Sequence, residues 1–156
     1  MGRDKREDYA TASPGMESIS LAGLPDRPLL LVDTAPIVYL LEGHAHYAAR
    51  FRPAFEAHAA GKVIFATTTI TLAEVLTGPL RAGNEALARR YRSLLQSWQL
   101  IDLNADIAET AARLRSTLRL KLPDAVQAAS ALAVGAAALI THDRDFSRLT
   151  ELRVIS

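Results

Sequence analysis

The segment Leu29-Leu-Leu-Val-Asp-Thr-Ala-Pro36 decides the fold of this chain. Four consecutive apolar residues are typical of a strand that is buried on both faces of a parallel sheet. Thr34 is expected to cap a helix over residues 35–41, with Pro36 in the first turn, where the missing N–H is harmless. A buried strand that leads directly into a helix predicts an α/β fold, with Asp33 at the carboxyl end of the first strand.

The same alternation continues along the rest of the chain. Short apolar runs predict further strands at residues 63–66, 99–103, 138–141 and 152–155. Helical spacing predicts helices at residues 47–59, 70–76, 85–97, 106–118 and 123–134, with Gly78 and Pro79 interrupting the chain after the second of them. Strands that alternate with helices predict three layers: a central, mostly parallel sheet of four to five strands with helices on both faces.

Length and composition bound the class of protein. With 156 residues, of which 49% are hydrophobic, the chain suits one domain, expected at residues 28–156, after a flexible arm at residues 1–27. The absence of cysteine excludes disulfides and thiolate catalysis and suits a reducing interior, so we expect a cytoplasmic protein. No apolar run approaches the roughly 20 residues that cross a bilayer. The net charge of +1 neither indicates nor excludes a nucleic-acid partner.

Four carboxylates lie directly against apolar runs: Asp33, Glu74, Asp124 and Asp143. Such groups are costly to desolvate unless a cation or hydrogen bonds compensate them. If they converge, a site made only of oxygen ligands favours Mg²⁺ or Mn²⁺ over zinc. These ions support the hydrolysis of phosphodiesters, which is therefore the expected class of reaction.

The segments around these acids resemble the PIN-domain ribonucleases, and more narrowly the VapC-type toxins of type II toxin-antitoxin pairs. The matching segments are Leu-Val-Asp-Thr at Asp33, Leu-Ala-Glu-Val-Leu at Glu74, Leu-Pro-Asp-Ala-Val-Gln-Ala-Ala at Asp124, and Leu-Ile-Thr-His-Asp-Arg-Asp-Phe at Asp143. Each is weak alone, but four in this order are specific. The resemblance covers the chain from about residue 29 to the end.

This resemblance implies a Mg²⁺-dependent endoribonuclease in which the four acids form the catalytic and metal-binding pocket, with Asp145 as a fifth, outer ligand. It also implies an RNA substrate, a homodimer, and a cognate antitoxin whose C-terminal arm blocks the active-site groove. Cleavage would leave a 5′-phosphate and a 3′-hydroxyl.

Simpler structural roles compete with the catalytic interpretation. Asp33 could cap the following helix, and Asp124 would be stabilised in the first turn of a helix whatever its function. Asp143 could be a turn residue, and Asp145 a cap for the segment around Phe146. For Glu74 the alternative is an exposed helical glutamate.

Several other side chains are expected near the site. The hydroxyls of Thr34 and Thr141 lie next to the expected pocket and could hydrogen-bond a metal-bound water or a phosphate, although capping explains them equally well. Arg119 and Lys121 are the expected RNA contacts closest to the pocket, and His142 is expected to face the substrate. A helix with Arg89, Arg90 and Arg92 offers further phosphate contacts, whereas Tyr39, Tyr47 and Trp98 are assigned to the core or a dimer interface.

Two other classes of function compete with the nuclease. A degenerate or receiver-like domain would bind Mg²⁺ for regulation without cutting RNA, but receivers need paired acids after the first strand, and all four nuclease acids are present here. A haloacid-dehalogenase-like phosphatase needs a second aspartate two positions after the first, where this chain has Ala35.

Overall fold

The computed structural model describes residues 17–156, so residues 1–16 of the expected arm lie outside the described part of the chain. Five strands form one sheet in the order β3-β2-β1-β4-β5, and every neighbouring pair is parallel. The strands are β1 Leu29–Val32, β2 Ile64–Thr68, β3 Gln99–Ile101, β4 Ala138–Ile140 and β5 Val154–Ile155. The prediction of an α/β fold with a parallel sheet is confirmed.

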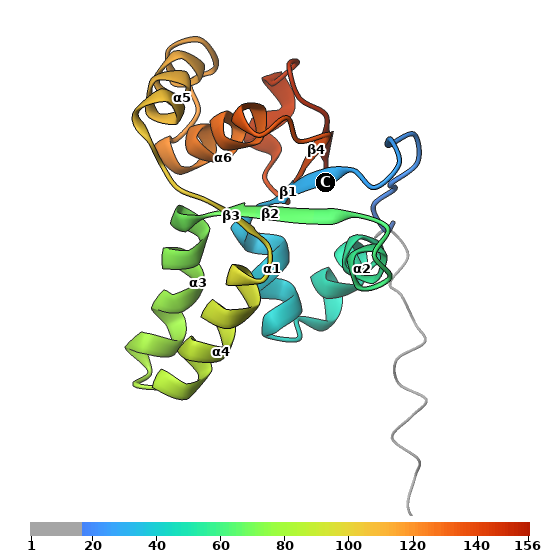
Figure 1. Cartoon of the computed structure of the whole chain (residues 1–156), viewed down its shortest axis with the longest axis vertical. Helices are drawn as coiled ribbons and strands as arrows, with labels where there is room; N and C mark the ends of the chain where they lie inside the picture. Colours follow the sequence, from blue (N-terminus) through green and yellow to red (C-terminus); the bar gives the residue numbers. More distant parts are fainter. Residues whose placement is uncertain (1–16) are drawn as a thin grey trace, which may run out of the picture.

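Helices cover both faces of the sheet, which gives the three layers seen in Figure 1. Alternate strand residues point to opposite faces, so Leu30 and Val32 belong to one core cluster and Leu31 to the other. Below the sheet in Figure 1 lie α1 Thr34–Leu41, α2 Ala45–Ala59, α3 Thr69–Arg81 and α4 Glu85–Gln96. Above it lie α5 Ala105–Leu118 and α6 Leu122–Ala133. Within residues 17–156 no helix has the length and apolar character needed to cross a membrane.

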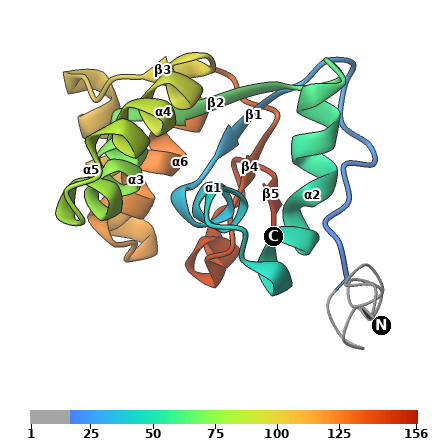
Figure 2. The same cartoon turned by 90° about the horizontal axis from the view of Figure 1, so that it is seen from below.

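The strand order places β1 at the centre of the sheet. From β1 the chain builds outward through β2 and β3, then returns to add β4 and β5 on the other side of β1. Figure 2 shows α3 and α4 towards the β3 edge and α2 towards the opposite edge. Ligands of such sheets bind outside the carboxyl ends of the strands where the order reverses, which here is the point between β1 and β4.

Two local predictions were wrong. Asp33, not Thr34, is the N-cap of α1, and its carboxylate accepts a hydrogen bond from the Thr34 backbone N–H. The interruption expected at Gly78 and Pro79 is also absent, because α3 continues through both residues to Arg81. Pro79 has no N–H to donate to the carbonyl four residues back, so α3 continues through this residue without that hydrogen bond.

The part of the expected arm nearest the domain is packed rather than loose. Ile19 is 7% exposed and belongs to the core cluster on the α2 face of the sheet. Its backbone N–H donates to the carbonyl of Arg50 in α2, at 3.0 Å. The buried side chain of Ile19 and this hydrogen bond therefore hold the segment against the domain.

Candidate active site

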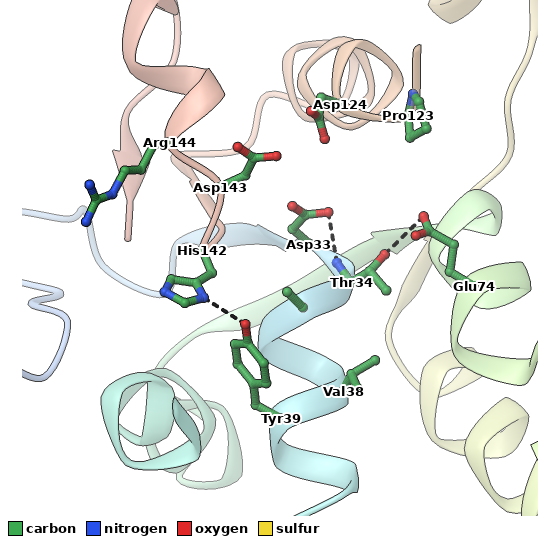
Figure 3. Close-up of a pocket in the computed structure, with 11 residues that line it drawn as sticks. Asp33, Thr34, Val38, Tyr39, Glu74, Pro123, Asp124, His142, Asp143 and Arg144 are labelled. Atoms are coloured by element: carbon green, nitrogen blue, oxygen red, sulfur yellow. Dashed lines mark hydrogen bonds between the residues drawn. The ribbon is translucent and has the colours of Figure 1, made fainter. Parts of the chain in front are cut away.

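A pocket of about 620 Å³ opens at the carboxyl ends of β1 and β4, at the reversal point of the sheet. The four predicted acids all line it: Asp33, Glu74, Asp124 and Asp143. Figure 3 shows these carboxylates converging from four different elements. Asp33 follows β1, Glu74 lies on α3, Asp124 on α6, and Asp143 follows β4. The fold therefore brings together acids that are far apart in the sequence.

Asp33 is held in place by three hydrogen bonds. Its Oδ1 accepts from the Thr34 backbone N–H and from Nε2 of Gln127, each at 2.8 Å. Its Oδ2 accepts from the Thr141 hydroxyl, also at 2.8 Å. Hydrogen bonds from three different donors fix the orientation of the carboxylate. Asp33 therefore both caps α1 and lines the pocket, so its structural role as a cap and its proposed catalytic role are compatible.

The buried amide of Gln127 holds Asp33 in place by a hydrogen bond, a role that was not predicted from the sequence. Gln127 lies on α6 and is 1% exposed. Besides Asp33, its Nε2 donates to the Thr71 hydroxyl at 2.7 Å, and its Oε1 accepts from the Thr68 hydroxyl at 2.6 Å. Both amide protons and the amide oxygen of Gln127 form hydrogen bonds, so the orientation of its side-chain amide is fixed. A single glutamine among the alanines of a buried helix was the signal for it.

Glu74 is linked to the same network through Thr34. The Thr34 hydroxyl lies 2.9 Å from that of Thr71 and donates to Oε1 of Glu74 at 3.3 Å. Burial and the charge of Asp33 raise the pKa of Glu74, although the hydrogen bond from Thr34 opposes this effect. Thr34 therefore contacts one acid of the pocket, and its expected hydrogen bond to a metal-bound water or a phosphate stays a prediction.

Among the pocket carboxylates, Asp124 has the surroundings that most disfavour its ionised form. Its Oδ2 is buried and has no hydrogen-bond partner among the described residues. Burial, together with the negative charges of Asp143 and Asp33, raises its pKa from 3.8 to about 7. Its place in the first turn of α6 should by itself favour ionisation. Stabilisation by the helix therefore does not explain this residue, because burial and the surrounding charges outweigh the effect of the helix on its pKa.

Asp143 and Asp145 complete the acidic group. Asp143 is the N-cap of the short 3₁₀ helix η1, Arg144–Arg148, and its Oδ1 accepts from the Asp145 N–H at 2.8 Å. Carboxylate oxygens of Asp124, Asp143 and Asp145 all lie within 4.8 Å of one another. Asp145, expected as the outer member, is thus part of the tightest cluster. Three converging carboxylates, one with an unpaired buried oxygen, fit a hard divalent cation.

Aromatic side chains form the wall opposite these acids. The Tyr39 hydroxyl lies 2.7 Å from Nδ1 of His142, and both residues line the pocket (Figure 3). Burial and the charges of Arg50 and Arg144 lower the pKa of His142. His142 faces the pocket as expected. Tyr39 packs against a core cluster, in agreement with its assignment to the core, and it also lines the pocket.

The predicted RNA contacts lie beside the pocket rather than in it. Arg119 and Lys121 line a smaller adjacent cavity, which shares Arg144 with the main pocket. The arginines of α4 are not among the pocket residues, and Trp98 is a core residue at 7% exposure.

Comparison with known proteins gives consistent results. The profile of the PIN domain matches residues 30–152. A toxin-antitoxin complex from Klebsiella pneumoniae contains a chain that is 30% identical, with 81% of this chain and 96% of that chain covered and a TM-score of 0.65. VapBC-1 from nontypeable Haemophilus influenzae is 24% identical, covering 81% and 96%, with a TM-score of 0.62. No curated protein matches the chain.

A further structure, at lower identity, shows the fold alone. VapC20 of Mycobacterium tuberculosis, described as a toxin that cleaves the sarcin-ricin loop, is 21% identical over 80% of this chain and 98% of that chain, with a TM-score of 0.61.

Proposed function

The chain belongs to the PIN-domain family, and from this premise we propose that it is a Mg²⁺-dependent endoribonuclease that hydrolyses phosphodiester bonds of RNA. One observation carries the proposal: the buried Oδ2 of Asp124 has no hydrogen-bond partner among the described residues. The same side chain belongs to a cluster of three carboxylates within 4.8 Å. A divalent cation supplies the compensation that this oxygen lacks.

Asp124, Asp143 and Asp145 are the residues that would hold Mg²⁺ or Mn²⁺, with Asp33 and Glu74 facing them across the pocket. When bound, such an ion lowers the pKa of water and neutralises charge that develops on the phosphate. Without it, the mutual repulsion of the carboxylates would also repel the phosphate of a substrate.

The residues of the chain supply orientation and charge. Thr141 donates to Asp33 and accepts from the backbone N–H of Asp143, so the acids after β1 and β4 keep a fixed relative position. The raised pKa of Glu74 improves its capacity to accept a proton from an attacking water. On the opposite wall, the paired Tyr39 and His142 present an aromatic and polar surface to the substrate.

We further propose that the enzyme is a toxin that a cognate antitoxin inhibits. The support is the similarity to a chain of the Klebsiella pneumoniae toxin-antitoxin complex, at 30% identity over 81% of this chain. A homodimer is part of the same proposal. Co-expression with the protein encoded beside it, followed by light scattering of the free and bound forms, tests both partners.

The test of the nuclease is cleavage of total RNA by the purified protein with Mg²⁺, with Mn²⁺ and with EDTA. We expect cleavage only with metal, and mapped fragments with a 5′-phosphate and a 3′-hydroxyl. Asp124→Asn should abolish cleavage, whereas Asp102→Asn, which changes an exposed aspartate outside the pocket, should not. Metal binding without cleavage of any RNA would instead indicate the regulatory domain.

A further inference from the structure

A second cavity, of about 280 Å³, lies beside the acidic pocket. It is formed by the end of α5, the loop to α6, and η1. Four cationic side chains line it: Arg119, Lys121, Arg144 and Arg148. Arg144 also lines the acidic pocket, and the lining residue Asp145 belongs to the carboxylate cluster. The two cavities therefore meet at η1.

The connection between α5 and α6 is built so that two of these cations reach the cavity. Arg119 ends α5 with a left-handed backbone, at φ 56 and ψ 35. For a residue other than glycine this conformation costs about 1–2 kcal/mol. The next residues are fixed by a hydrogen bond from Arg115 Nε to the Leu120 carbonyl. The chain thus reverses within three residues, and a strained arginine occupies a position that favours glycine.

The charge of this basic cavity is not compensated within the described part of the chain. None of the four cations forms an ion pair with another residue in the range 17–156, where the ion pair found is Arg113 with Glu109. Asp145 is the one acidic residue among those lining the basic cavity. Four exposed cations around one carboxylate leave a net positive cavity that attracts an anion.

We propose that the basic cavity binds the RNA phosphate next to the one that is cleaved. The inference rests on the proposed function, because it requires that the acidic pocket receives a phosphodiester. RNA carries a negative charge on every nucleotide, so one strand can place one phosphate at the carboxylate cluster and its neighbour among the arginines. The guanidinium fork matches phosphate oxygens in pairs, and cations at phosphates account for most of the affinity of such contacts.

The test removes two cations of the basic cavity and compares the effect on RNA binding with the effect of removing two cations elsewhere on the protein. The double variant Arg119→Gln, Arg148→Gln is matched by the control double variant Arg52→Gln, Lys62→Gln, which removes two exposed cations in α2 and in the turn after it, away from both cavities. Binding of a short fluorescent single-stranded RNA is measured by anisotropy over a series of KCl concentrations, with Ca²⁺ as the hard cation with oxygen ligands in place of Mg²⁺. Thermal unfolding of each variant reports whether the fold is retained.

We expect the first double variant to bind RNA about tenfold more weakly. Its plot of log affinity against log salt should be shallower by about 0.7 for each phosphate charge that the variant no longer neutralises. The control double variant should bind RNA like the unchanged protein. A second pair, Lys121→Gln with Arg148→Gln, leaves the left-handed residue untouched and should weaken RNA binding equally. In cleavage assays KM should rise while kcat is unchanged.

Four results would overturn the inference. The first is no measurable RNA binding by the unchanged protein, and the second is an equal loss of binding in the control double variant. The third is unchanged RNA binding by the first double variant together with lost binding of a polyglutamate peptide, which would assign the basic cavity to an acidic protein segment. The fourth is RNA cleavage by the first double variant with an unchanged KM, which keeps the proposed nuclease. A protein that cuts no RNA but loses RNA binding in the first double variant refutes the proposed nuclease and keeps only the statement that the basic cavity binds an RNA phosphate.

Discussion

Replacement of Asp124 by asparagine should stabilise the metal-free protein above neutral pH. Burial and neighbouring charges raise the pKa of this carboxyl from 3.8 to about 7. Between these values the folded state binds a proton that the unfolded state has released, so stability falls as the pH rises from about 4 to about 7. Above pH 7 the full loss of folding stability caused by the Asp124 charge is present. Asparagine carries no charge, so the variant does not have this loss.

The magnitude follows from the shift. A change of about three pKa units corresponds to an upper limit of about 4 kcal/mol. Asp124 is partly exposed, so solvent screening reduces this to about 1–2 kcal/mol. Loss of a negative charge from the first turn of α6 takes back about 0.5 kcal/mol. The expected net gain is about 1 kcal/mol, or about 2–4 °C in Tm for a chain of this size.

The assay is thermal unfolding in EDTA at about pH 4 and about pH 8. Asp124→Asn should have the higher Tm at the alkaline value and no advantage at the acidic one, while the control Asp102→Asn should match the unchanged protein at both. Added Mg²⁺ should then raise the Tm of the unchanged protein and not that of Asp124→Asn. An equal effect at both pH values, or a loss of stability at pH 8, would refute the electrostatic account of this residue.

Two further substitutions test the support of Asp33. Gln127→Leu should lower the unfolding free energy by about 2–3 kcal/mol and reduce cleavage, since buried hydrogen-bonding groups of Asp33 and Thr68 lose their partner. Urea unfolding measures the change in stability, with Gln96→Leu at an exposed position as the control. An equal effect of the two substitutions would contradict the prediction. Asp33→Asn should abolish cleavage and, unlike Asp124→Asn, destabilise the metal-free protein by about 1–2 kcal/mol because it removes charge-assisted hydrogen bonds; a more stable Asp33→Asn would argue against the three bonds.

The strands and the position of the pocket could be predicted from sequence because they depend on continuous patterns, whereas the order of the strands in the sheet was seen only in the structure. Buried apolar runs at β1 and β4 predicted the strands, and Asp33 and Asp143 each follow such a run directly. Since the carboxyl ends of parallel strands lie at one edge of the sheet, their convergence follows from the fold.

What sequence reasoning missed depends on side-chain direction in three dimensions. Gln127 supports Asp33 across a helix–strand contact, and no spacing along the chain reveals that its amide meets Thr68 and Thr71. Tyr39 was assigned to the core or an interface and does pack against a core cluster, but its hydrogen bond to His142 was not predicted. Asp145 was predicted as an outer ligand, and the structure brings its carboxylate close to those of Asp124 and Asp143.

Direct titration of the purified, metal-stripped protein with Mn²⁺, followed by electron paramagnetic resonance of the free ion, tests the central claim of a shared cation site. Saturable binding by the unchanged protein and by Asp102→Asn, displaced by Mg²⁺ and lost in Asp124→Asn and Asp143→Asn, is the predicted result. Binding that persists when both pocket acids are replaced together, or an unchanged protein that takes up no Mn²⁺, would contradict it.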